Sequence, residues 1–231
     1  MNAQLVSTCV HSFAFHSLFF EAISSCKLTK KRAGGRGMTP IQEISNAVTM
    51  VLPTWVIAWN ACLNSSSMVV LLLVGSCIHL PFSLLYHTCA ALKCYPDRID
   101  NDLRRLDQSM QHVVGTMFSF ALSGSFKYAA LNLIFNAMCI RRLWDADTSN
   151  DGKRWISVMQ CILMYTLPII WRGDVYNYVL AISSIGVGGL CFIPCMNCRV
   201  FNGWGHTVFH LLLSVYAQAL ANSALLMVRS K

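Results

Sequence analysis

The sequence predicts an all-α, polytopic membrane protein in which a seven-transmembrane helix bundle follows a basic N-terminal tail. Of its 231 residues, 55% are hydrophobic and only 12% are charged, and the mean hydropathy is +0.50. Such a chain is too apolar for an ordinary soluble domain. Each crossing of a bilayer needs roughly 20 apolar residues, so seven helices use about 140 and leave short loops in one compact domain.

Residues 1–45 are expected to form a cytoplasmic tail rather than a cleaved signal. An apolar stretch at 6–23 precedes a basic run, whereas a secretory signal has its charges first. The pattern favours an amphipathic surface helix or an unstructured tail, joined by the Gly-rich AGGRG linker. The bundle is then predicted over 46–228, with a C-terminal tail at 229–231.

Seven apolar segments follow the linker, each separated from the next by turn-forming residues. They cover 46–63, 68–92, 104–124, 126–143, 155–171, 174–197 and 204–228. The fourth and fifth are marginal as membrane spans. Prolines occur within the segments, which a helix in lipid tolerates when neighbours satisfy the freed carbonyl.

The distribution of Lys and Arg predicts the orientation, because positively charged loops stay in the cytoplasm. With seven spans, one side holds 14 of the 18 basic residues. These are Lys27, Lys30, Lys31, Arg32, Arg36, Lys93, Arg98, Arg104, Arg105, Arg141, Arg142, Lys153, Arg154 and Arg199. The N-terminus is therefore expected in the cytoplasm and the C-terminus outside or in a lumen, with plasma membrane and endomembranes both open. The net charge of +8 indicates attraction to anionic lipid in the bilayer, and we expect no nucleic-acid partner.

The 11 cysteines lie mostly inside apolar runs, where they are interpreted as small packing residues. The segment CFIPCMNC at 191–198 contains a CxxC pair that can bind metal or act in redox chemistry. Only one such pair exists, without a second pair or histidine at zinc-finger spacing. The packing interpretation is therefore preferred there too.

Ionisable side chains within membrane helices are costly to bury, which makes each a functional candidate. His87 ends the second segment, Asp107 begins the third, and His206 and His210 begin the seventh. Alternating topology places these three segment ends on the same side. His206 and His210 lie one helical turn apart and can bind one ion. With His87 they predict a three-imidazole zinc (Zn²⁺) site with a fourth position open to water.

Asp107 and Ser83 are the candidate catalytic residues. Asp107 can serve the bound water as general base and later as proton donor. Ser83 lies one turn before His87 and can donate to a developing oxyanion or orient a partner. The alternatives are a salt bridge of Asp107 with a neighbouring arginine and an anchoring role for His87 at the membrane interface. His79 and His112 are interpreted as packing or hydrogen-bonding residues.

Four motifs resemble those of the progestin and adiponectin receptor family and its haemolysin III-like relatives, within the superfamily that includes alkaline ceramidases. The segment 43–49 resembles that family's E-x-x-N-x-x-T motif, with Met50 where a histidine is usual. SLLYH at 83–87, LRRLDQSM at 103–110 and GHTVFH at 205–210 resemble its other motifs. Order and spacing agree over about 43–228.

The resemblance implies a seven-helix fold with a cytoplasmic N-terminus and zinc held by His87, His206 and His210. It places Asp107 and Ser83 beside the metal-bound water and implies hydrolysis of a lipid amide such as ceramide, or of another lipid acyl bond. Two other classes of function stay open. One is a signalling receptor with a structural zinc and a lipid or extracellular ligand, and the other is a channel or transporter with a proton relay.

Overall fold

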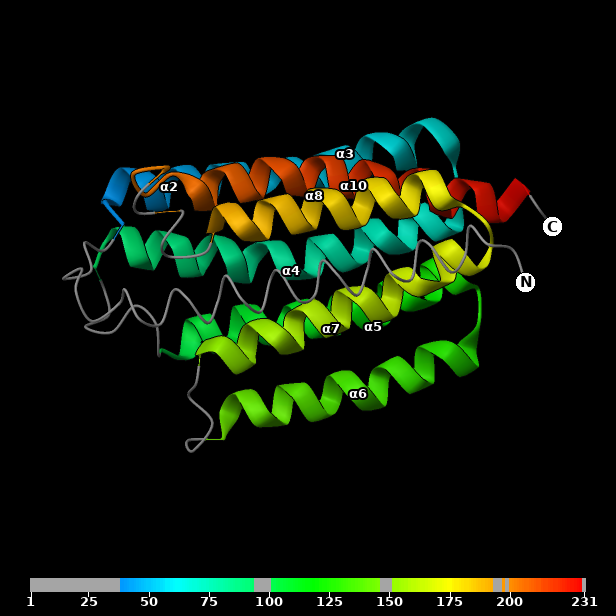
Figure 1. Cartoon of the computed structure of the whole chain (residues 1–231), viewed down its shortest axis with the longest axis horizontal. Helices are drawn as coiled ribbons and strands as arrows, with labels where there is room; N and C mark the ends of the chain where they lie inside the picture. The colour runs from blue at the N-terminus through cyan, green and yellow to red at the C-terminus, as the bar shows by residue number, and fades with distance from the viewer. Residues whose placement is uncertain (1–37, 94–100, 146–150, 193–196, 198–199, 230–231) are drawn as a thin grey trace.

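A computed structural model describes residues 38–93, 101–145, 151–192, 197 and 200–229, which form helices and no strand. The helices lie side by side along one long axis (Figure 1). Their bounds are α2 Pro40–Thr49, α3 Val51–Asn64, α4 Ser67–Ala91, α5 Asp102–Ser123, α6 Phe126–Trp144, α7 Asp151–Trp171, α8 Val175–Phe192 and α10 Gly205–Arg229. In the described part of the chain, each of the seven predicted segments coincides with helix, and the first is divided into α2 and α3.

Five helical stretches are long and apolar enough to cross a membrane. They are Pro40–Asn64, Ser67–Ala91, Arg154–Trp171, Val175–Phe192 and Gly205–Met227. Large apolar side chains face outward along the bundle, among them Trp55, Trp59, Val70, Val74, Leu131, Ile134, Val179 and Val187. A surface of this kind is stable against lipid and not against water. The chain is therefore a multi-pass helical membrane protein.

The other two predicted spans, α5 and α6, are long enough but too polar to meet the same criterion. Lys127, Arg141 and Arg142 lie near the ends of α6. Along α5, polar side chains are buried because α4, α6 and α7 pack around this helix. Of the two segments expected to be marginal, α6 does not meet the criterion, whereas α7 does. The count of seven spans thus stays a prediction.

Helix α2 begins at Pro40, six residues before the predicted start of the bundle at 46. The Thr39 backbone N–H donates to the Gln42 side chain at 2.8 Å, and the Thr39 hydroxyl accepts from the Gln42 backbone N–H at 3.4 Å. This reciprocal pair and proline at the first position are strong helix-start signals. The chain then breaks at Met50, three residues before Pro53, whose ring removes one helical donor.

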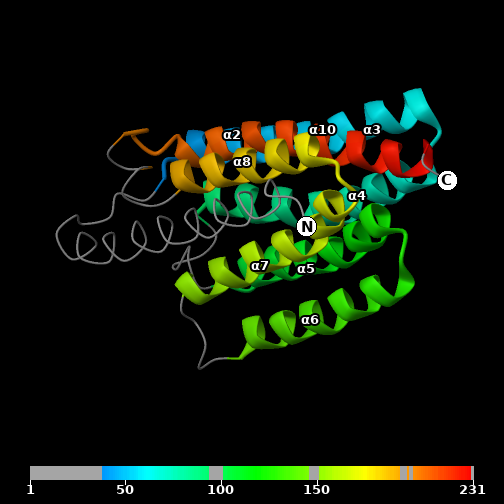
Figure 2. The same ribbon diagram turned by 45° about the vertical axis from the view of Figure 1, so that its right-hand side comes forward.

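Small residues allow α8 and α10 to pack closely. Ala181 of α8 and Ala221 of α10 are fully buried, and Gly188 of α8 lies against Phe209 of α10. Close approach of this kind replaces the missing hydrophobic driving force between helices in lipid. Helix α6 lies at the edge of the bundle (Figures 1 and 2), where Asn136 accepts from His112 of α5 at 2.9 Å. The interpretation of His112 as a hydrogen-bonding residue is thus confirmed.

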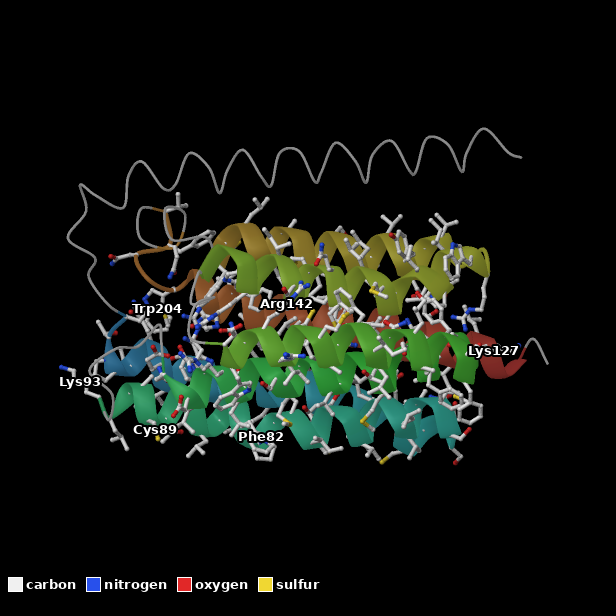
Figure 3. The ribbon with its side chains drawn as sticks, turned by 90° about the horizontal axis from the view of Figure 1, so that it is seen from below. Phe82, Cys89, Lys93, Lys127, Arg142 and Trp204 are labelled. Carbon is white, nitrogen blue, oxygen red and sulfur yellow. The ribbon has the colours of Figure 1, made fainter. Side chains whose placement is uncertain are left out.

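Consecutive long helices alternate in direction, so their ends gather in two groups (Figures 1 and 2). The start of α2, the end of α4 and the starts of α5 and α10 share one end of the bundle. Lys93 and Trp204 lie at this end, and Lys127 lies at the other (Figure 3). The described basic residues Arg104, Arg105, Arg141, Arg142 and Arg154 belong to helix ends on the Lys93 side.

Substitution of Gly205 by alanine is expected to destabilise the protein by about 1–3 kcal/mol through overpacking. An added Cβ would lie 2.0 Å from the Cys191 carbonyl oxygen and 2.9 Å from Asn197 Oδ1. The first contact is with the backbone, so rotation of a side chain cannot relieve it. Thermal unfolding in detergent measures the effect. Gly75→Ala is the control, because its Cβ would meet only the Phe118 and Met117 side chains, at 3.1 Å and beyond. Equal melting temperatures for the two variants would refute the expectation.

Candidate metal centre

Three buried histidines from two helices form the centre. His87 comes from the last turns of α4, and His206 and His210 come from the first turns of α10. One potential ligand atom from each lies within 4.8 Å of the other two. The ring centroids are 5.0 Å apart for His87 and His206, 5.3 Å for His87 and His210, and 4.5 Å for His206 and His210. The exposed fractions are 2%, 9% and 3% respectively.

Helix α2 supplies hydrogen-bond acceptors to the outer nitrogens of two of these rings. Nδ1 of His87 donates to a carboxylate oxygen of Glu43 at 2.9 Å. Nδ1 of His210 donates to the backbone carbonyl of Asn46 at 2.9 Å, and the Thr49 hydroxyl lies 3.3 Å from the same nitrogen. A carboxylate and a carbonyl only accept, so each Nδ1 carries the proton. In the neutral ring, Nε2 then keeps the lone pair that binds a metal.

The donor set suits a first-row transition metal. Neutral imidazoles bind zinc, copper, iron and nickel, and a centre of three histidines leaves a coordination position for another ligand. Nitrogen ligands of a tetrahedral zinc lie about 3.4 Å apart, so the histidines need only small rotations to close on an ion. The cluster can therefore hold a metal ion.

Asp107 lies beside the histidines, at the start of α5. Its Oδ1 accepts from Nε2 of His79 at 2.9 Å, and its Oδ2 accepts from the Gln111 amide at 3.4 Å. The Ser83 side chain also hydrogen-bonds with Asp107, and His87 and His210 lie near enough to interact with it electrostatically. Polar side chains of α4 and α5 thus hold the Asp107 carboxylate next to the three histidines.

An aromatic cluster flanks the centre on the side of α7, α8 and α10. The ring of Phe192 lies 4.4 Å from that of His206 and 4.7 Å from that of Trp155, measured between centroids. Phe209 packs against the same rings, 5.9 Å from Phe192 and 6.2 Å from Trp155. All three are partly exposed. The centre therefore has a polar side and an aromatic side.

The structure brings all five predicted site residues together. His87, His206 and His210 form the cluster, and Ser83 and Asp107 contact each other beside it. Among the cysteines in the described part of the chain, Cys62 and Cys77 face outward rather than packing inside, whereas Cys139, Cys161 and Cys191 are buried. The second and third cysteines of CFIPCMNC, Cys195 and Cys198, lie outside the described residues, as does the apolar stretch 6–23.

Sequence reasoning gave no role in the centre to Glu43 and Asn46 of α2, although both match the family motif at 43–49, and it did not place His79 there. Glu43 is 1% exposed, yet it falls within the predicted tail, outside the segments in which a buried ionisable residue marks a functional site. The Thr39–Pro40 start signal would have placed it in a helix. His79 does form a hydrogen bond, as expected, but its partner is Asp107. Its position two turns before His87 on one face of α4 is the signal that could have identified it.

No family model matches the chain, and neither a curated protein nor a solved structure matches it. The fold and the centre define its class by themselves. It is a multi-pass helical membrane protein with a buried three-histidine cluster, able to hold a metal ion, at one end of its bundle.

Proposed function

We propose that the protein is a zinc-dependent hydrolase of a lipid amide, similar in chemistry to a ceramidase and related to the progestin and adiponectin receptor family. The observation that carries the proposal is the position of Asp107, a buried carboxylate held by His79 beside three buried histidines. A structural zinc needs its ligands only. A hydrolase also needs a proton acceptor next to the metal, and Asp107 meets that need.

The surroundings of the centre favour an acyl lipid as substrate. The centre lies at the end of the bundle where α4 ends and α10 begins (Figure 1), and we expect this end to face the region where the polar linkage of a lipid meets its chains. The aromatic side formed by Trp155, Phe192 and Phe209 suits a hydrocarbon chain, and the side of Ser83 and Asp107 suits the amide group. The aromatic side and the polar side both border the histidine cluster, so one bound lipid can contact the two sides at once.

Zinc, when bound, lowers the pKa of water and polarises the scissile carbonyl. The protein's own residues handle the proton and the orientation. Asp107 accepts the proton that water loses as its oxygen bonds to the carbonyl carbon, and then delivers it to the amide nitrogen as the carbon–nitrogen bond breaks. His79 orients the carboxylate. The Ser83 hydroxyl hydrogen-bonds with Asp107 in the structure, and rotation of this hydroxyl would let it donate to the oxygen that gains charge. The products are a fatty acid and an amine.

The test is hydrolysis by the purified full-length protein in liposomes that contain ceramide, a related lipid amide or a lipid ester. We expect release of fatty acid from an amide substrate, its loss after chelation, and its recovery on addition of zinc. Mass spectrometry of the released acid measures turnover. If turnover is absent with every acyl lipid while the protein holds zinc, the hydrolase proposal fails and the receptor alternative gains support.

A further inference from the structure

We infer that Glu43 is a positioning residue that sets the affinity of the centre for its metal by holding the ring of His87. The inference rests on the proposed zinc centre and deepens it, because it assigns part of the metal affinity to a helix that supplies none of the three histidines. Glu43 itself does not reach the reacting atoms in this assignment; it acts through His87.

The contact between the two side chains is completely enclosed. Glu43 is 1% exposed and His87 is 2% exposed, and 2.9 Å separates the carboxylate oxygen from Nδ1. A buried carboxylate is costly unless it accepts hydrogen bonds, so its presence here requires partners. His87 and, at 3.5 Å, the Asn46 amide provide them. The carboxylate thereby fixes the rotation of the His87 ring and increases the electron density at Nε2.

The neighbouring turn of α2 contacts the second α10 ligand in the same way. The Asn46 backbone carbonyl accepts from His210, and the Asn46 side-chain oxygen accepts from Thr207 at 2.7 Å. Residues 43 and 46 are one turn apart and so lie on one face of α2. That face therefore orients one ligand from α4 and one from α10. Glu43 is the charged member, and its removal is expected to have the larger effect.

The test compares zinc affinity in purified full-length protein, measured by competition with a chelator of known affinity. Glu43→Gln keeps the size of the side chain and an accepting oxygen but removes the charge. We expect it to bind zinc about 10–100-fold more weakly than wild type, as other outer-sphere substitutions do. The visible absorption of bound Co²⁺ is expected to keep its tetrahedral form, since all three histidines remain.

Gln42→Ala is the matched control on the same helix. Gln42 is equally part of the buried face, and its amide donates to the Asn202 carbonyl at 2.9 Å, so its removal loosens α2 without touching a histidine. We expect it to retain wild-type zinc affinity. An affinity loss in Gln42→Ala as large as that in Glu43→Gln would overturn the inference, because docking of α2 would then explain both.

If Glu43→Gln bound zinc as tightly as wild type, the inference about Glu43 would also be overturned, while the proposed function would stand. Absence of zinc binding in the wild type would instead defeat the proposed function itself. If Glu43→Gln does not fold, Glu43→Asp is measured in its place. This variant keeps the charge but has a shorter side chain, which moves the carboxylate away from His87. Reduced zinc affinity in this variant supports the role of the carboxylate contact, and wild-type affinity contradicts it.

Discussion

Asp107→Asn is expected to lower lipid-amide turnover by about 10²–10⁴-fold, the usual contribution of a general acid–base residue. The asparagine oxygen can still accept from His79, so the contact that orients the side chain is kept. The amide cannot accept a proton from water, and the proton transfer is lost. Turnover with ceramide or another acyl lipid in liposomes measures the effect, and metal analysis of the same sample is expected to show full zinc content.

Asp102→Asn is the control for this substitution. Asp102 begins the same helix, but its side chain is 81% exposed and its ion pair is a surface contact with Arg105 at 3.7 Å. It is expected to retain turnover. Full turnover in Asp107→Asn would remove Asp107 from the chemistry. Loss of zinc together with turnover would show that Asp107 supports the metal rather than the reaction, as in a receptor with structural zinc.

His87→Ala is expected to lower zinc affinity by more than about 100-fold, since loss of a ligand exceeds the 10–100-fold effect of an outer-sphere change. His87 is the only one of the three histidines that comes from α4, and the two that remain share a single turn of α10. Its removal also takes one hydrogen-bond donor from the buried Glu43 carboxylate. Zinc content after purification and chelator competition measure the loss.

His112→Ala is the matched control, because His112 is fully buried in α5 and hydrogen-bonds with Asn136 outside the cluster. We expect a lower melting temperature and unchanged zinc content. Unchanged zinc affinity in His87→Ala would place the metal elsewhere. The channel or transporter alternative predicts ion flux through the wild-type protein in liposomes. It would be favoured if His87→Ala abolished this flux and chelation left it unchanged.

The helical architecture could be predicted because the hydrophobic segments and turn residues are local signals. The first boundary was wrong by six residues, since composition changes gradually there while the helix is fixed by the contacts of Thr39, Pro40 and Gln42. The polar character of α5 has another origin. Its buried Asp107 and His112 hydrogen-bond with side chains of α4 and α6, and hydropathy alone does not reveal which neighbours surround a helix.

The meeting of the three histidines could be predicted because alternating helices bring the end of one segment and the start of another to the same side. The aromatic cluster and the contact of His79 with Asp107 could not. The order of the segments does not determine how each helix is rotated about its axis or packed against its neighbours. The aromatic cluster depends on packing between α7, α8 and α10, and the contact of His79 with Asp107 depends on packing between α4 and α5. Glu43 matches the family motif at 43–49 but lies before the predicted start of the bundle at 46, so no buried partner was predicted for it.

Metal analysis of the purified wild-type protein shows whether the three histidines bind zinc. A three-histidine centre predicts about one zinc per chain, bound tightly enough to survive purification in chelator-free buffer. His87→Ala, purified in parallel, is expected to contain only background zinc. The proposed zinc centre would be contradicted if the wild type contained no zinc under conditions in which a control zinc protein retains its metal.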